Sequence, residues 1–263
     1  MNTVMKRRIS ASLVAIALTA GGLGVAGCGG DSSSASSSVT SASTTDNGVA
    51  SLTASEILTK SMAAAKAATS VTVSGSVEQG SGTINIDLAL GDGVASGTVG
   101  INGVTVKILR VDGKFYLNAP KALFDQIGTG GGAVGTLLAG KWFTVPNTGT
   151  AADSFKDIGE ISDMDTLFDG LLDNASPKVK GTGDVNGQPV VLLTESNDDG
   201  TLAVATTGEP YPLQVKQTTG GTSVVTFSKW NEPVTVTAPA DALDFGAIAG
   251  GDSSSAGSTT SSN

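Results

Sequence analysis

A two-residue period in hydrophobicity is the feature that most constrains the fold of this chain. Apolar residues alternate with polar or small ones over residues 83–90, and the same alternation recurs over 71–77 and 104–108. Such a period places the apolar side chains on one face of a β-strand. Asn-Gly at 102–103 precedes the run over 104–108, and Asp-Gly at 112–113 follows it. Turns of this kind join antiparallel strands. The pattern therefore predicts an antiparallel sheet.

Helices interrupt the predicted strands. Apolar residues recur at helical spacing in three stretches: 54–67, 120–127 and about 164–174. Thr53 and Glu56 form a capping-box pattern at the first helix, and Asp163 is the expected N-cap of the last. Further strands are predicted at 114–117, 141–145, 190–194, 202–206, 213–217, 224–228 and 234–236. This order predicts an α+β fold, in which one strongly curved antiparallel β-sheet has helices against one face.

The N-terminal region indicates export. The only cysteine of the chain, Cys28, follows an apolar run over 9–20 that is preceded by three basic residues at 6–8. This order is typical of a secretory signal peptide, and the run is too short to span a membrane. Residues 25–28, Val-Ala-Gly-Cys, resemble the lipobox of bacterial lipoproteins, whose cysteine takes a diacylglyceryl group. We expect residues 1–27 to be a lipoprotein signal peptide and Cys28 to be lipidated; the alternative is an ordinary signal peptide with a stray cysteine.

The lipid anchor sets the expected organisation of the mature chain. Two or three acyl chains on Cys28, palmitate among them, would hold the protein on the extracytoplasmic face of the cell membrane. Residues 28–51 are rich in serine and are expected to form a flexible tether. Residues 52–248 form the predicted folded domain, and 249–263 have the composition of a disordered tail.

The composition excludes several classes of function. The chain has 24 acidic and 15 basic residues, a formal net charge of −9 and no histidine. Phosphate backbones repel such a chain, so nucleic acid is not an expected partner. A Cys/His zinc site and a histidine-dependent serine hydrolase are excluded. We therefore expect no cofactor, no metal and no enzymatic activity.

The aspartates at 163, 165, 169 and 173 do not match a calcium loop and fit capping and a solvated helix face better.

Three stretches carry a resemblance to a known family. They are the lipobox and tether followed by the helix over 54–67 and Val71–Gly75, the strand–turn–strand Leu109–Tyr116, and Pro210–Val215 followed by Val225–Val234. Their order resembles the LppX/LprA/LprF/LprG lipoproteins of actinobacteria and, more loosely, the LolA/LolB lipoprotein carriers. The resemblance implies a half-barrel with helices packed on its concave face, enclosing an apolar cavity for the acyl chains of lipids or glycolipids.

The strongest apolar patterns supply the candidate lining of that cavity. The strand contributes Ile84, Ile86, Leu88 and Leu90, and the helix contributes Met164, Leu167, Phe168, Leu171 and Leu172. The same residues also fit an ordinary hydrophobic core, and the sequence leaves both interpretations open. The glycine-rich stretch 128–135 is expected to be a flexible loop, with a lid as the functional alternative. Trp230 either covers the mouth of the cavity or packs the end of the sheet.

The function predicted from these features is that of a lipoprotein without catalytic activity. It would bind lipid or glycolipid acyl chains in the cavity and carry them in the cell envelope. Its expected partners are the membrane, through the anchor, a lipid or glycolipid ligand, and a membrane transporter or another envelope protein. The alternative is an envelope protein-interaction module without a lipid ligand. A large apolar cavity would favour the carrier, and a solid core would favour the interaction module.

Overall fold

The computed structural model describes residues 45–79, 82–127, 133–146, 155–172, 176–194, 200–218 and 221–249. Its strands are β1 (Ser70–Gln79), β2 (Gly82–Gly91), β3 (Val94–Ile101), β4 (Val104–Val111), β5 (Lys114–Asn118), β6 (Trp142–Val145), β7 (Lys178–Val185), β8 (Gln188–Thr194), β9 (Gly200–Ala205), β10 (Pro212–Gln217), β11 (Ser223–Ser228) and β12 (Leu243–Asp244). Its helices are the 3₁₀-helix η1 (Val49–Ser51) and the α-helices α1 (Ala54–Ala67), α2 (Lys121–Ile127), α3 (Ala133–Leu138), α5 (Lys156–Glu160), α6 (Met164–Leu172) and α7 (Phe245–Ala249).

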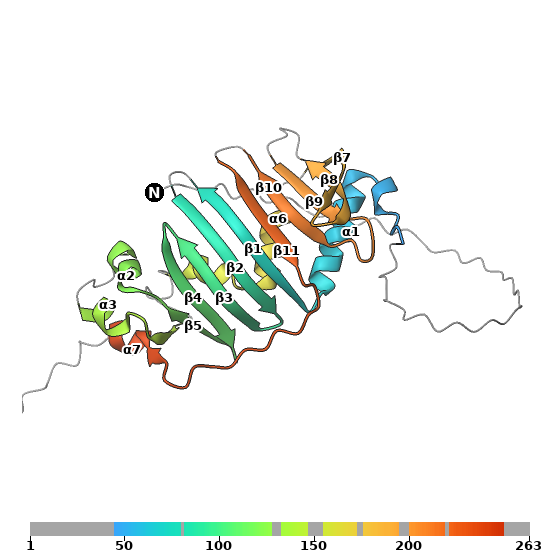
Figure 1. The fold of residues 1–263 in the computed structure, drawn as a ribbon. Coiled ribbons are helices and arrows are strands. Elements are labelled where there is room, and N and C mark those ends of the chain that lie inside the picture. Colours follow the sequence, from blue (N-terminus) through green and yellow to red (C-terminus); the bar gives the residue numbers. More distant parts are fainter. Residues whose placement is uncertain are drawn as a thin grey trace, which may run out of the picture. The chain divides into compact units, whose positions relative to one another are not determined.

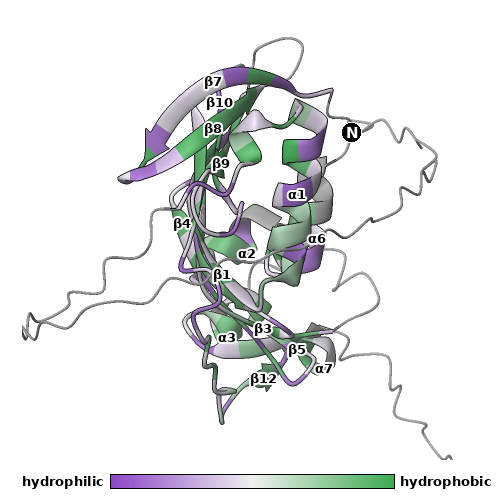
Figure 2. Cartoon of the chain, turned by 90° about the vertical axis from the view of Figure 1, so that its right-hand side faces the viewer, coloured by the Kyte–Doolittle hydropathy of each residue, from purple (hydrophilic) through white to green (hydrophobic). Residues whose placement is uncertain are grey.

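The strands form one open 12-stranded sheet in the order β12-β6-β5-β4-β3-β2-β1-β11-β10-β9-β8-β7 (Figure 1). Every neighbouring pair is antiparallel except β12 and β6, which are parallel. Figure 2 shows the curved sheet from its side, with α1 and α6 on one side of it. The prediction of an α+β fold with a strongly curved antiparallel sheet and helices against one face is therefore confirmed.

Two glycines allow neighbouring strands to approach closely: a Cβ atom at Gly75 of β1 would meet the backbone of β11, and one at Gly97 of β3 would meet the backbone of β2. Gly75 of β1 pairs with Ile86 of β2, and Gly97 of β3 pairs with Leu88. Both glycines have a positive φ, 152° and 147°, which L side chains rarely adopt. A Cβ atom at Gly97 would lie 2.0 Å from the carbonyl oxygen of Asp87. Only glycine fits these two positions, which lie in the curved middle of the sheet.

The predicted helix caps are present. Thr53 N donates a hydrogen bond to Glu56 Oε2 at 3.0 Å, and Glu56 N donates to Thr53 Oγ1 at 3.4 Å, which completes the capping box of α1. Asp163 Oδ1 accepts a hydrogen bond from Thr166 N at 3.0 Å at the start of α6. Both caps satisfy backbone N–H groups that have no partner within their helix.

The folded part begins before residue 52, so the predicted end of the tether is wrong. Asn47 Nδ2 donates to the carbonyl oxygens of Ala205 and Gly208 at 3.1 and 3.0 Å. Val49 is only 2% exposed and packs with residues of α1, β8 and β9. The serine-rich composition extends close to residue 47, but the hydrogen bonds of Asn47 and the burial of Val49 hold this segment against the folded domain. Cys28 and the rest of the tether up to residue 44 lie outside the described residues, as does the tail from residue 250.

Two other predictions of local structure are wrong. Residues 234–236 form no strand, because β11 already pairs with β1 and β10 on its two sides. The segment instead follows the ends of the strands towards β12 and α7 (Figure 1). Residues 133–135 begin helix α3 instead of belonging to a loop, and residues 128–132 of the glycine-rich stretch lie outside the described residues.

Candidate functional site: the concave face of the sheet

The structure brings the predicted strand and helix residues together. Leu88, Leu90 and Phe168 are fully buried in the largest hydrophobic cluster of the described residues. The partly buried side chains that pack against the same cluster include Ile84, Ile86, Met164 and Leu167. The side chains of Leu171 and Leu172, at the end of α6, lie outside the described residues. The described residues of β2 and α6 thus belong to one hydrophobic cluster, and their role as the lining of a lipid cavity remains a prediction.

The face of β2 that carries these residues has a buried half and a partly exposed half. Leu88 and Leu90 pair with Val73 and Val71 of β1, and all four are at most 1% exposed. Phe168 of α6 lies above this half, with its ring 5.5 Å from that of Phe227 in β11. The buried half is therefore a packed hydrophobic core between the sheet and α6.

The other half is apolar without being fully covered. Ile84 pairs with Ile101 of β3, Ile86 pairs with Gly75, and Gly75 also pairs with Val225 of β11. Val225 in turn pairs with Val215 of β10. The residues of this row share partial burial and contact with the large cluster, and we call them the open apolar strip: Ile84, Ile86, Ile101, Val215 and Val225.

The opposite face of the same strands is polar. Asn85 and Asp87 of β2 alternate with the isoleucines and are exposed. Asp87 pairs with Thr98 of β3, and Thr98 pairs with Lys107 of β4. A sheet face that water covers normally has this polar composition. The open apolar strip lies on the concave side, which the helices cover only in part.

An aromatic stack closes the end of the concave face near β11. Trp230 stacks on Tyr211 with ring centroids 4.4 Å apart and an interplanar angle of 5°. Its other contacts include Phe168 of α6, with ring centroids 5.6 Å apart. Asn231 Nδ2 donates to the Tyr211 hydroxyl at 2.7 Å, and Asn231 Oδ1 accepts from Thr69 N at 2.8 Å. Trp230 is half-buried, so it packs the end of the sheet as one of the two sequence interpretations predicted.

One ion pair fixes the start of α6 over the sheet. Arg110 of β4 donates through Nη1 to Asp163 Oδ2 at 2.5 Å, and both side chains are about one-third exposed, 29% and 35%. Burial by itself raises the pKa of Asp163, but hydrogen bonds from Thr166 and from Arg110, together with the charge of Arg110, outweigh it and lower the pKa. The carboxylate therefore stays ionised and acts as a helix cap.

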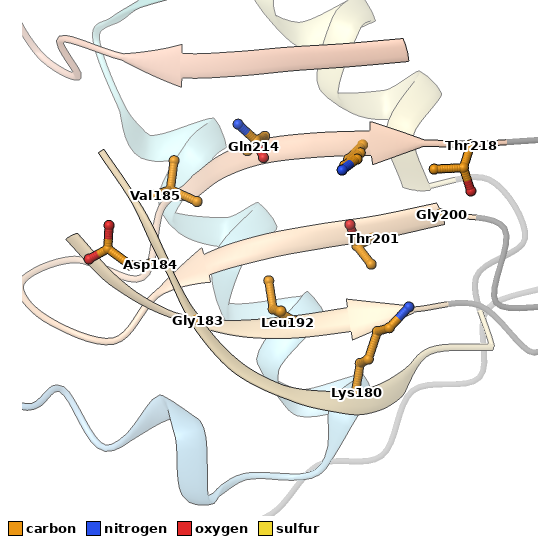
Figure 3. A pocket seen from close by; sticks show the side chains of 10 residues that line it. Lys180, Gly183, Asp184, Val185, Leu192, Gly200, Thr201, Gln214 and Thr218 are labelled. Atoms are coloured by element: carbon orange, nitrogen blue, oxygen red, sulfur yellow. The ribbon is translucent and has the colours of Figure 1, made fainter. Parts of the chain in front are cut away.

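A separate pocket lies on the face of the sheet that points away from α1. Figure 3 shows β7 crossing in front of β8 and β9. The resulting pocket of about 330 Å³ is lined by Lys180, Gly183, Asp184, Val185, Leu192, Gly200, Thr201, Gln214, Lys216 and Thr218. Its residue Leu192 alternates along β8 with Val191 and Leu193, which pack with α1. None of the predicted cavity residues lines this pocket.

Several polar groups of this pocket already hold the local structure. Asp184 Oδ1 accepts from Gly187 N at 2.7 Å within the β7–β8 turn, and Gln214 Nε2 donates to Thr226 Oγ1 at 3.4 Å. The pocket is of mixed polarity and has no apolar stripe. It is therefore a poor match for acyl chains compared with the open apolar strip.

Neither a metal centre nor a membrane-spanning helix is present in the described part of the chain. No group of three or more His, Cys, Asp or Glu side chains there is placed to hold a metal ion. No helix among the described residues is long and apolar enough to cross a membrane. The carboxylates of Asp169 and Asp173 lie outside the described residues, so their predicted solvated position stays a prediction.

Sequence reasoning missed three members of the open apolar strip. Ile101, Val215 and Val225 lie on three strands, and each is an unremarkable apolar residue within its own segment. They become a set only when the strand order and register are known, because β1 and β11 are neighbours although about 150 residues separate them. The available signal was the period-two pattern of each strand, which identifies a face but not its neighbours.

The sheet and the helices on its concave face define an open half-barrel, and similar solved structures are known. LprF from Mycobacterium bovis is 18% identical, with 71% of this chain and 96% of that chain covered and a TM-score of 0.48. The lipoprotein LppX from Mycobacterium tuberculosis is 17% identical, with 73% and 100% covered and a TM-score of 0.43. LprF and LppX are members of the lipoprotein group that the sequence resembles. An uncharacterized conserved protein from Thermus thermophilus is 10% identical, with 73% and 97% covered and a TM-score of 0.35. No family model and no curated protein matches the sequence.

Proposed function

We propose that this protein is a membrane-anchored extracytoplasmic lipoprotein that binds the acyl chains of a lipid or glycolipid on its concave face. It carries them within the cell envelope without catalysing a reaction. The observation that carries this proposal is the open apolar strip, whose residues are apolar, lie on a concave surface and are only partly covered by the helices. Burial of apolar area is the driving force for such binding, at about 25 cal/mol per Å².

The helices are the part of the fold that would admit a chain. Met164 and Leu167 of α6 are partly buried beside the strip and pack against the same cluster. A small displacement of α6 would extend the strip into a groove between helix and sheet. Each methylene of an acyl chain that enters this groove contributes about 0.8 kcal/mol, so no chemical step is needed for uptake.

The membrane anchor is a separate part of the proposal and rests on the sequence alone. Cys28 follows the lipobox-like residues 25–27, and one acyl chain by itself holds a protein on a membrane only marginally, whereas two or three hold it firmly. The folded domain begins by residue 46, where Asp46 bridges to Thr207. About 18 residues of serine-rich chain therefore separate the lipid from the domain. Such a tether would let the concave face reach the membrane and an envelope partner.

A charge placed in the open apolar strip tests the binding site. In Ile86→Asp the carboxylate lies where the acyl chain would lie, and we expect lipid uptake per folded molecule to fall at least tenfold. Asn85→Asp adds the same charge one residue away on the opposite, exposed face, and uptake should remain at the wild-type level. Displacement of a fluorescent fatty-acyl probe measures both. Equal uptake by the two variants would remove the strip as the lipid site and favour the protein-interaction alternative.

A further inference from the structure

Two buried side-chain donors in the described part of the structure have no hydrogen-bond partner. They are the hydroxyl of Ser61 and the indole N–H of Trp230. Buried polar groups are nearly always paired, and each exception requires an explanation. The indole N–H can only donate and the hydroxyl can donate, so an acceptor such as a carbonyl oxygen would satisfy each of them.

Ser61 lies in the middle of the buried face of α1. Ile57 and Ala65 are one turn away on either side, and all three residues are 0% exposed. Ile57 packs in a small cluster that includes Leu202, and Ala65 packs in the large cluster that includes Val215. Leu202 and Val215 are register partners on neighbouring strands. The hydroxyl therefore lies at the seam between the two apolar clusters, next to the β10 end of the open apolar strip.

Trp230 supplies the second donor on the same side of the sheet. Its ring lies between Tyr211 and Phe168 of α6, and α6 also contacts α1. The two donors therefore belong to the layer between the helices and the concave face. Ser61 lies beside the open apolar strip, from which the acyl chains enter this layer in the proposed function, and Trp230 lies against Phe168 over the buried half.

We propose that Ser61 and Trp230 donate hydrogen bonds to ester carbonyl oxygens of the bound lipid, so that the site selects ester-linked over ether-linked chains. This inference rests on the proposed function. Both donors are buried and have no partner in the protein, so a carbonyl that reaches them supplies the missing hydrogen bond. An ether-linked chain buries the same methylenes but offers no carbonyl. The strip would hold the chains, and the two donors would fix the position of the ester groups.

The test compares two lipids that differ only in this linkage. The secreted chain, residues 28–263 with Cys28→Ala, is titrated with dipalmitoylglycerol and with its dihexadecyl ether analogue, each displacing a fluorescent alkyl probe that carries no ester. We expect the wild-type site to prefer the ester by roughly threefold to tenfold per hydrogen bond. Ser61→Ala and Trp230→Phe should each lower the preference by one such factor and leave the affinity for the ether unchanged.

Melting temperatures of the lipid-free variants provide the matched control. Ser61→Ala removes a hydroxyl without a partner, so its melting temperature should equal or exceed that of the wild type. Ser162→Ala removes a hydroxyl that is also buried, at 2% exposure, but donates to Gly159 O at 2.7 Å. Its melting temperature should fall while the preference for the ester stays unchanged.

The two possible failures are distinguishable. The inference would be overturned if the wild type bound both lipids with equal affinity, or if both donor variants kept the full preference for the ester. Lipid binding itself would still stand, and water would then be the partner of the two donors. Failure of both lipids to displace the probe would contradict the proposed function, and the inference would fall with it.

Discussion

Asp163 is the residue whose charge most directly supports the arrangement of helix and sheet. Its carboxylate accepts hydrogen bonds from Thr166 at the start of α6 and from Arg110 on β4. The N-cap role was predictable, because an aspartate directly before an apolar helical stripe is a local signal. The ion pair was not, because Arg110 is 53 residues away in the sequence and only the fold brings it near.

The lowered pKa of Asp163 predicts how stability changes with pH. A carboxylate whose pKa is lower in the folded state contributes stability above its unfolded pKa, and this contribution is lost as pH falls through the folded value. Asp163→Asn should therefore lower the melting temperature at pH 7, and the deficit should shrink as the pH falls below the ordinary value of 3.8. Melting curves of both proteins between pH 2 and about pH 7 measure this difference. A deficit that stays constant over the range would show that the charge of Asp163 contributes nothing.

At the scale of strands and helices, Gly97 determines how closely β3 approaches β2. Gly97→Ala would place a Cβ atom 2.0 Å from the backbone of β2 at a φ of 147°, so β3 would have to move. We expect a loss of about 2 kcal/mol or more in the free energy of unfolding. Gly100→Ala in the same strand is the control, because its Cβ atom meets only the side chain of Asn85 at 3.4 Å. Urea denaturation compares the two variants, and equal losses would contradict a special role for Gly97.

The periodicity of hydrophobic residues was enough to predict most of the strands and helices. The predictions that failed did so for physical reasons. Strand β3 was missed because its glycines at 97 and 100 interrupt the alternation. Residues 234–236 alternate well but form no strand, because a strand also needs a free edge to pair with. Of the candidate site, the local pattern identified Ile84 and Ile86 but not their neighbours on β10 and β11. Ser61 was missed as well, although its spacing of four from Ile57 and Ala65 places it on the buried face of α1.

For the whole molecule, the central questions are whether a lipid anchors the domain to the membrane and whether the domain binds lipid there. The structure describes the domain, whereas the anchor is a prediction from residues 25–28. Cys28→Ala should shift the protein from the membrane fraction to a soluble or unprocessed form, because the thiol that accepts the lipid is missing. Fractionation of cells followed by immunoblotting measures this distribution. Membrane association at the wild-type level in the variant would contradict the lipid anchor.

The proposed binding of acyl chains is the claim on which the other functional statements depend. Native mass spectrometry of the chain with Cys28→Ala, secreted from its own cells, tests it most directly, because no covalent lipid then contributes to the mass. We predict species heavier than the bare chain by the mass of one lipid, which leave on collisional activation, and a loss of these species in Ile86→Asp but not in Asn85→Asp. A spectrum of the bare chain alone, under conditions that preserve the folded charge states, would contradict the account.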